Sequence, residues 1–237
     1  MQETKKFKAA DGKTILVEVN SRRGSNAGVL AIHGYGGNIN EHILYNVAQQ
    51  FPAEGFDIWR IALYPGDKNT RTMIDASGHE HISDIARVLK AMHKKYIKVF
   101  LIGHSYGGTL AIRSANEKIK AVVLWDPAHN SKTEDDDEIQ PDSNPKFWRV
   151  NWGIILLVTR KYEKEFVELT HYDDLLPTYK KPTLVLLASA YNKDYKTMRE
   201  HKAFRFSVIK NSDHCFNNEG NEKELFSKTL KFIKSIK

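Results

Sequence analysis

Cysteine is nearly absent from this sequence, since Cys215 is the only one among 237 residues. This scarcity excludes an internal disulfide framework and favours a reducing compartment. An apolar leader is also missing, because the first residues include Glu3, Lys5 and Lys6. The longest strongly apolar run, residues 153–158, is far too short to cross a bilayer. These absences predict a cytoplasmic protein with no membrane span.

Motifs for nucleic acid, metal and cofactor binding are missing as well. The net charge is +7, but the lysines are scattered, and we interpret the densest set, within residues 223–237, as the solvated face of a helix. The glycine-rich residues 34–37 match neither a dinucleotide fingerprint nor a phosphate loop. His79 and His81 would point to different faces of the expected helix, with no further ligands, and we interpret them as helix-surface residues. We therefore expect no nucleic-acid partner, no metal and no cofactor.

A regular alternation of strand and helix patterns runs through residues 29–126. Hydrophobic residues make up 41% and charged residues 27% of the chain, as in ordinary globular proteins. The alternation predicts an α/β fold with a mostly parallel, doubly wound sheet and helices on both faces. An opening hairpin is predicted around Asp11-Gly12. The expected strands after it are residues 27–32, 55–63, 99–102, 121–125, 182–188 and 203–209, and the main expected helices are 41–54, 79–93 and 222–236.

The alternation breaks at residues 128–181, which combine an acidic run at 134–138 with an aromatic-rich segment. We interpret this stretch as an inserted helical cap that lies over the carboxyl ends of the strands, where open sheets bind ligands. The core then comprises residues 1–127 and 182–237. Extra helices at the edge of the sheet are the alternative.

A sharp turn is predicted where the strand at residues 99–102 meets the next helix. The pattern Gly-x-Ser-x-Gly occurs there as Gly103, Ser105 and Gly107. In such a turn the serine takes strained backbone angles and its hydroxyl is exposed above the sheet, so the flanking positions need residues without side chains. The amino terminus of the following helix suits an oxyanion. The alternative is a glycine-rich turn whose serine only caps the helix.

A second glycine-rich segment, residues 33–38, directly follows the apolar strand at 27–32. Glycines at 34, 36 and 37 indicate a backbone that approaches another group closely. We interpret this segment as an oxyanion loop, with a plain turn as the alternative.

Three polar residues have the chain order expected of a nucleophile, an acid and a base. A serine hydroxyl is a poor nucleophile at neutral pH and needs an adjacent base, usually a histidine held by a carboxylate. Ser105, Asp194 and His214 occur in this order, and each follows an expected strand. The three side chains are therefore expected at the same edge of the sheet. Cys215, next to His214, is expected to be small and buried.

Together these segments resemble the α/β-hydrolase superfamily. The resemblance rests on residues 33–37, 103–108 and 212–216, and it covers nearly the whole chain except the cap. It implies that Ser105 is the nucleophile and His214 the general base. It also implies that the backbone N–H groups of Tyr35 and Tyr106 form the oxyanion hole.

Two departures from the family pattern matter. No short Gly-x-x-Asp turn precedes Asp194, so Asp126, which follows the strand at 121–125, is the alternative acid. Asp213 adjoins His214 and is not expected to orient it. Residues 60–67 stand where many relatives have Asp-x-x-Gly-x-Gly, which prevents assignment to the commonest esterase branches.

These residues predict a serine hydrolase that cleaves small-molecule esters or thioesters through an acyl-enzyme. The aromatic cap suggests an apolar or aromatic acyl or alcohol group. Amide or peptide hydrolysis, or acyl transfer by the same triad, is one alternative. A non-catalytic ligand-binding protein with this fold is another. The oligomeric state stays open.

Overall fold

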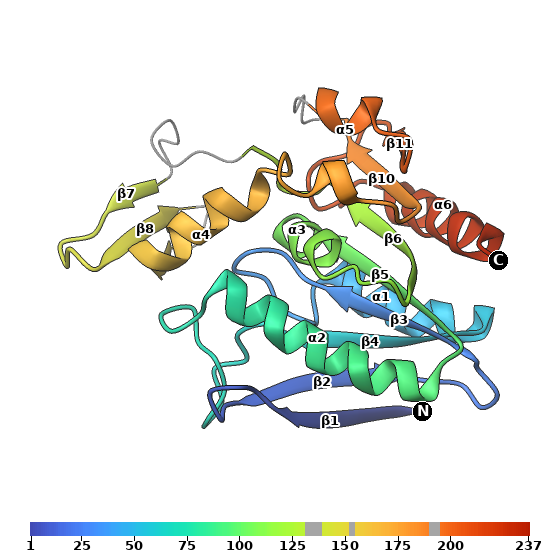
Figure 1. Cartoon of the computed structure of the whole chain (residues 1–237), viewed down its shortest axis with the longest axis horizontal. Helices are drawn as coiled ribbons and strands as arrows, with labels where there is room; N and C mark the ends of the chain where they lie inside the picture. The colour runs from blue at the N-terminus through green and yellow to red at the C-terminus, as the bar shows by residue number, and fades with distance from the viewer. Residues whose placement is uncertain (131–138, 152–154, 190–194) are drawn as a thin grey trace.

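The computed structural model of the chain describes residues 1–130, 139–151, 155–189 and 195–237. Within these residues the main sheet has eight strands, in this order across the sheet: β1 (Gln2–Lys8), β2 (Thr14–Asn20), β4 (Phe56–Ala62), β3 (Ala27–Ile32), β5 (Lys98–His104), β6 (Ile119–Trp125), β10 (Thr183–Ala188) and β11 (Phe204–Ile209) (Figure 1). β1 and β2 form an antiparallel hairpin, and β2 is antiparallel to β4. The remaining neighbours are parallel. The prediction of a mostly parallel α/β sheet is confirmed.

Helices cover both faces of this sheet. α2 (Gly78–Lys95) and α3 (Tyr106–Arg113) pack on one face, and α1 (His42–Gln50) and α6 (Asn221–Ser235) pack on the other. The shorter elements are η1 (Phe51–Glu54), η2 (Leu176–Thr178) and α5 (Lys196–Glu200). None of the helices within the described ranges has the length and apolar content needed to span a membrane.

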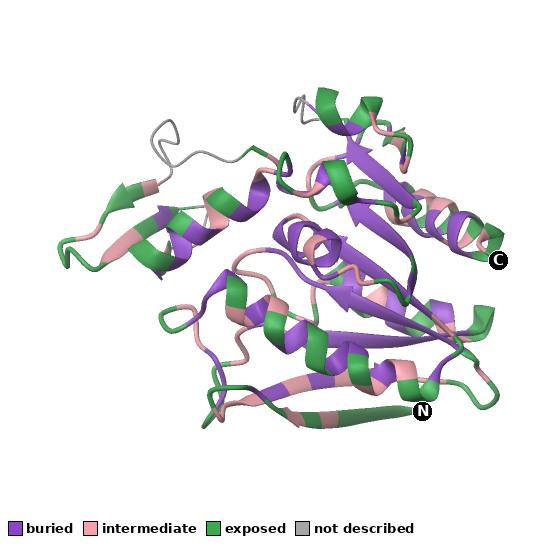
Figure 2. Cartoon of the chain, viewed as in Figure 1, coloured by how far each residue is buried: buried purple, intermediate pink, exposed green. Residues whose placement is uncertain are grey.

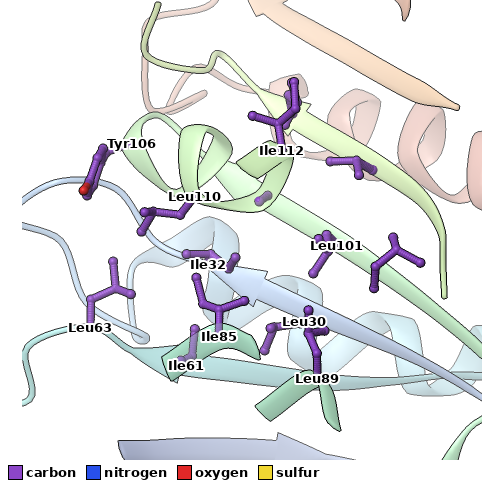
Figure 3. Close-up of a cluster of buried hydrophobic side chains, with 14 of the residues drawn as sticks. Leu30, Ile32, Ile61, Leu63, Ile85, Leu89, Leu101, Tyr106, Leu110 and Ile112 are labelled. Atoms are coloured by element: carbon purple, nitrogen blue, oxygen red, sulfur yellow. The ribbon is translucent and has the colours of Figure 1, made fainter. Parts of the chain in front are cut away.

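The central strands are buried on both faces, whereas β1 at the edge is largely exposed (Figure 2). Successive residues of β3 face opposite sides of the sheet. Leu30 and Ile32 pack among Ile85 of α2 and Leu110 of α3, as Figure 3 shows. Val29 instead joins the cluster on the other face. Fully burying a side chain of this size contributes about 1.5–3 kcal/mol, so packing on both faces holds the central strands firmly in the sheet.

The inserted region contains a second, antiparallel sheet in addition to a helix. Its strands are β7 (Ile139–Pro141), β8 (Phe147–Asn151) and β9 (Ile155–Thr159), and the helix is α4 (Arg160–Thr170). The predicted helical cap thus has a helix, but the prediction missed the three strands that precede it. Val150 and Val158 are buried against Tyr162 of α4, while their strand neighbours are more exposed. Alternate residues of β8 and β9 therefore pack on α4, and this packing on one helix stabilises the small sheet.

A buried ion pair holds the loop that follows β4. Arg71 Nε donates to Asp84 Oδ2 on α2 at 2.7 Å, and Arg71 Nη1 donates to Asp11 Oδ2 in the hairpin turn at 2.8 Å. The side chains of Arg71 and Asp84 are each only 5% exposed. Arg71 therefore ties the loop to two separate parts of the fold.

Replacing Asp84 should destabilise the fold strongly. Asp84→Ala leaves a buried guanidinium without its main partner, and we expect a loss of about 3 kcal/mol in the free energy of unfolding. Glu224→Ala is the control, because Glu224 forms a partly exposed i,i+4 pair with Lys228 on α6, and i,i+4 helix pairs contribute about 0.5 kcal/mol. Urea unfolding measures both, and equal losses would contradict a structural role for the buried pair.

Candidate active site

Ser105 lies in the sharp turn between β5 and α3, as the sequence predicts. Its backbone angles are φ 52° and ψ −120°, a conformation that costs a non-glycine residue about 1–3 kcal/mol. Three hydrogen bonds hold it there. Ser105 N–H donates to the Trp125 carbonyl at 3.0 Å, and the Ser105 carbonyl accepts from Gly108 N–H at 2.9 Å and Ala128 N–H at 3.0 Å. The end of β6 thus restrains the strained serine.

The two motif glycines are required by close backbone packing. A Cβ on Gly103 would collide with the backbone of Gly107. A Cβ on Gly107 would collide with the carbonyl oxygens of Ile32 and His33. The first turn of α3 therefore lies directly against the end of β3. This contact brings Ser105 next to the glycine-rich segment that follows β3.

His214 and Asp126 meet at the same edge of the sheet. His214 Nδ1 lies 2.6 Å from Asp126 Oδ2. Because an ionised carboxylate only accepts hydrogen bonds, Nδ1 carries the proton and Nε2 is the nitrogen suited to act as a base. The Asp126 side chain is 1% exposed, and its Oδ1 accepts from Ala188 N–H at 3.1 Å. The end of β10 therefore orients the carboxylate that orients His214.

The histidine loop is attached beside the serine through His104. His104 Nε2 lies 2.9 Å from the His214 carbonyl oxygen, and the centroids of the two imidazole rings are 4.8 Å apart. His104 immediately precedes Ser105. His214 and Asp126 are thus in contact at the edge of the sheet where β5, β6 and β11 end, and Ser105 follows β5 at the same edge.

The other predicted residues of this region have mixed outcomes. Asp194 lies outside the described residues, so its prediction as the acid stays a prediction. Asp213 turns into its own loop, where its carboxylate accepts from Asn217 N–H and Nδ2–H at 2.9 and 2.8 Å. Cys215 is exposed, and the prediction that it is buried was wrong. Phe216, whose φ is 57°, takes the buried position instead.

The predicted oxyanion loop passes directly beside Ser105. A Cβ on Gly34 would lie 3.3 Å from Ser105 Cβ, so only a glycine allows this approach without displacement. Gly36 has φ +69°, which favours glycine for conformational reasons. Tyr106 is the first residue of α3, and its N–H is one of the amides without an intrahelical acceptor. The rings of Tyr35 and Tyr106 are in edge contact at 5.7 Å.

The inserted region packs on this loop. The Tyr35 ring stacks on Tyr162 of α4 at 5.2 Å and contacts Phe166 edge-on at 5.0 Å. Leu156 of β9 occupies the space that a Cβ on Gly36 would need. The aromatic residues of the insertion therefore cover the glycine-rich loop.

Sequence reasoning did not single out Glu41 as part of this site. Glu41 Oε1 accepts from Asn38 N–H at 3.0 Å, and Oε2 lies 3.9 Å from His104 Nδ1. Burial raises the pKa of Glu41 to about 7. The carboxyl group thus lies between the glycine-rich loop and the residue before Ser105. Nothing in the local pattern distinguishes it from other acidic residues near a helix start.

His81, which was expected on the helix surface, is buried, whereas His79 is exposed. His81 Nε2 lies 3.2 Å from the Leu63 carbonyl oxygen. Burial lowers the pKa of His81 to about 3. Within the described residues, no three His, Cys, Asp or Glu side chains gather as a metal site requires.

Residues 29–208 match a sequence model described as the alpha/beta hydrolase family, which is more than half of the chain. The chain belongs to this family. A search of curated proteins finds no match. The resemblance inferred from the elbow, the glycine-rich loop and the histidine loop is therefore confirmed at the level of the family.

Solved structures of alpha/beta hydrolases share the fold at low sequence identity. Est1E from Butyrivibrio proteoclasticus with bound ferulic acid has a TM-score of 0.77 and 16% identity, with 95% of this chain and 96% of that chain covered. A putative hydrolase from Agrobacterium vitis has a TM-score of 0.78 and 15% identity, with 99% and 98% covered. The esterase domain of a Rhodothermus marinus protein has a TM-score of 0.75 and 16% identity, with 100% and 99% covered.

The burial of Glu41 predicts a specific pH dependence of stability. The folded-state pKa is about 7, above the reference value of 4.5. Between these pH values the unfolded chain has lost a proton that the folded protein retains, so the stability contributed by this site falls as pH rises. Glu41→Gln removes the titration. In urea unfolding, the stability of the variant relative to wild type should increase from about pH 5 to about pH 8.

The control for this measurement is Glu219→Gln, which removes an exposed glutamate. The same pH dependence in both variants would contradict the assignment to Glu41.

Proposed function

We propose that this alpha/beta hydrolase is a serine hydrolase that cleaves small-molecule carboxylic esters or thioesters through an acyl-enzyme. The observation that carries the proposal is the 2.6 Å contact between His214 Nδ1 and Asp126 Oδ2, at the sheet edge where Ser105 occupies its strained turn. Membership of the alpha/beta hydrolase family, and the esterases among the solved structures with a similar fold, support the broader assignment as a hydrolase.

In the proposed reaction, Ser105 Oγ attacks the substrate carbonyl and His214 Nε2 accepts its proton. Asp126 keeps His214 in the required tautomer and stabilises the imidazolium that forms. The N–H groups of Tyr35 and Tyr106 donate to the oxyanion of the tetrahedral intermediate. His214 then returns the proton to the leaving group and activates water, which releases the acid and regenerates Ser105.

An aromatic acyl or alcohol group is the proposed substrate preference. The Tyr35, Tyr162 and Phe166 rings pack together where the insertion meets the glycine-rich loop. Est1E, a fold neighbour, was solved with ferulic acid bound. Nitrophenyl esters of aromatic and aliphatic acids are therefore suitable first substrates, and matched nitroanilides test the amidase alternative.

The triad is tested by isosteric changes at the three candidate acids. We expect Asp126→Asn to lower kcat by about 10⁴, because the amide would hold His214 in the wrong tautomer. Asp213→Asn is the matched control beside His214 and should retain activity close to wild type. Ser105→Ala should abolish both ester turnover and intact-mass labelling by a fluorophosphonate.

Asp194→Asn completes the series and decides between the two acids. Loss of turnover in this variant, with activity retained in Asp126→Asn, would overturn the assignment of Asp126. Labelled wild type that hydrolyses nitroanilides faster than esters would favour the amidase alternative. Unlabelled, inactive wild type would contradict the serine mechanism altogether.

A further inference from the structure

The hydroxyl of Tyr64 joins both residues that flank Tyr35. Tyr64 lies in the loop after β4, within the stretch 60–67 that departs from the family pattern. Its hydroxyl donates to the Gly34 carbonyl oxygen at 3.0 Å and accepts from Gly36 N–H at 2.8 Å. One phenolic oxygen therefore connects to the backbone on each side of the proposed oxyanion donor.

The Gly34 carbonyl and the Tyr35 N–H belong to the same peptide unit. None of the peptide bonds among the described residues is cis, so the C=O and the N–H of this planar unit point in opposite directions. A hydrogen bond to Gly34 O thus fixes the direction of Tyr35 N–H. It also polarises the peptide and strengthens the N–H as a donor.

A second side chain donates to the same carbonyl. Leu63 N–H donates to His33 Nε2 at 3.0 Å, which leaves the proton on Nδ1. His33 Nδ1 lies 2.9 Å from Gly34 O and therefore donates to it. Burial lowers the pKa of His33 to about 4, so the ring is neutral at physiological pH and keeps this tautomer. Residues 63 and 64 together control the two side-chain contacts to this carbonyl, which also accepts from Gly37 N–H at 3.2 Å.

The loop that supplies these groups is itself braced. His81 Nε2 of α2 lies 3.2 Å from the Leu63 carbonyl oxygen. The Tyr64 ring contacts His33 and His81 edge-on, with centroids 5.2 and 5.7 Å apart. The phenol is therefore held by ring packing independently of its hydroxyl.

We propose that Tyr64 is a positioning residue for the oxyanion site, which acts by orienting and polarising the peptide that carries Tyr35 N–H. This inference rests on the proposed function. It assigns a role to the stretch where the chain differs from many alpha/beta hydrolases. Tyr64 touches neither nucleophile nor base in this role, and its effect reaches the reaction only through the Gly34–Tyr35 peptide.

The test is Tyr64→Phe, which removes one oxygen and keeps the ring. The matched control is Tyr179→Phe. Tyr179 is also buried, and its hydroxyl lies 2.7 Å from Thr183 Oγ1. This pair lies at the start of β10, whereas the site lies at the other end of that strand. We expect kcat for a nitrophenyl ester to fall about tenfold or more in Tyr64→Phe, with KM changed by less than about threefold. Tyr179→Phe should keep both values.

A second measurement uses a trifluoromethyl ketone, whose adduct with the serine carries an oxyanion. Its Ki should rise in Tyr64→Phe by about the factor by which kcat falls, because both depend on the same donor. The ratio of Ki to KM does not depend on the concentration of folded enzyme, so partial misfolding leaves it interpretable.

The outcomes separate the two proposals. Serine-dependent turnover in wild type, with equal kcat and Ki changes in Tyr64→Phe and Tyr179→Phe, would overturn the role of Tyr64 and leave the proposed function standing. A rise in KM alone would overturn it as well. Turnover that survives Ser105→Ala unchanged would instead refute the proposed function, and the inference about Tyr64 with it.

Discussion

The close approach of α3 to the ends of β3 and β5 is the constraint on which the site depends. Gly103 and Gly107 allow backbone to touch backbone there, with no side chain between. The same contact forces Ser105 into its strained turn and brings Gly34 beside it. The packing of the central sheet supplies the stabilisation that maintains this strain.

Several buried polar groups near the turn are paired with one another across separate loops. Gly34 O receives hydrogen bonds from His33 and Tyr64, and Leu63 contacts both His33 and His81. Each pairing avoids the cost of burying an unsatisfied group. The network also leaves the loop few alternative conformations, which is the condition for a preorganised oxyanion site.

The insertion contributes a largely apolar cover to this network. Burial raises the pKa of Tyr106 and of Tyr162 well above the usual tyrosine value, so both rings are neutral at physiological pH. Their contacts with Tyr35 connect α4 to the glycine-rich loop. Exclusion of water by such a cover strengthens hydrogen bonds to a developing charge.

Local sequence patterns by themselves determined the central strands, the main helices and the turn at Ser105, because period and glycine placement are properties of short segments. They also singled out His214 and the loop at residues 33–37. Only the tertiary structure brought Asp126 to His214, since that distance depends on how β6, β10 and β11 pack. It likewise decided that Phe216 rather than Cys215 is buried, that residues 139–159 include a small sheet, and that Tyr64 contacts Gly34 and Gly36. These contacts join residues far apart in the chain, and no pattern within one segment encodes them.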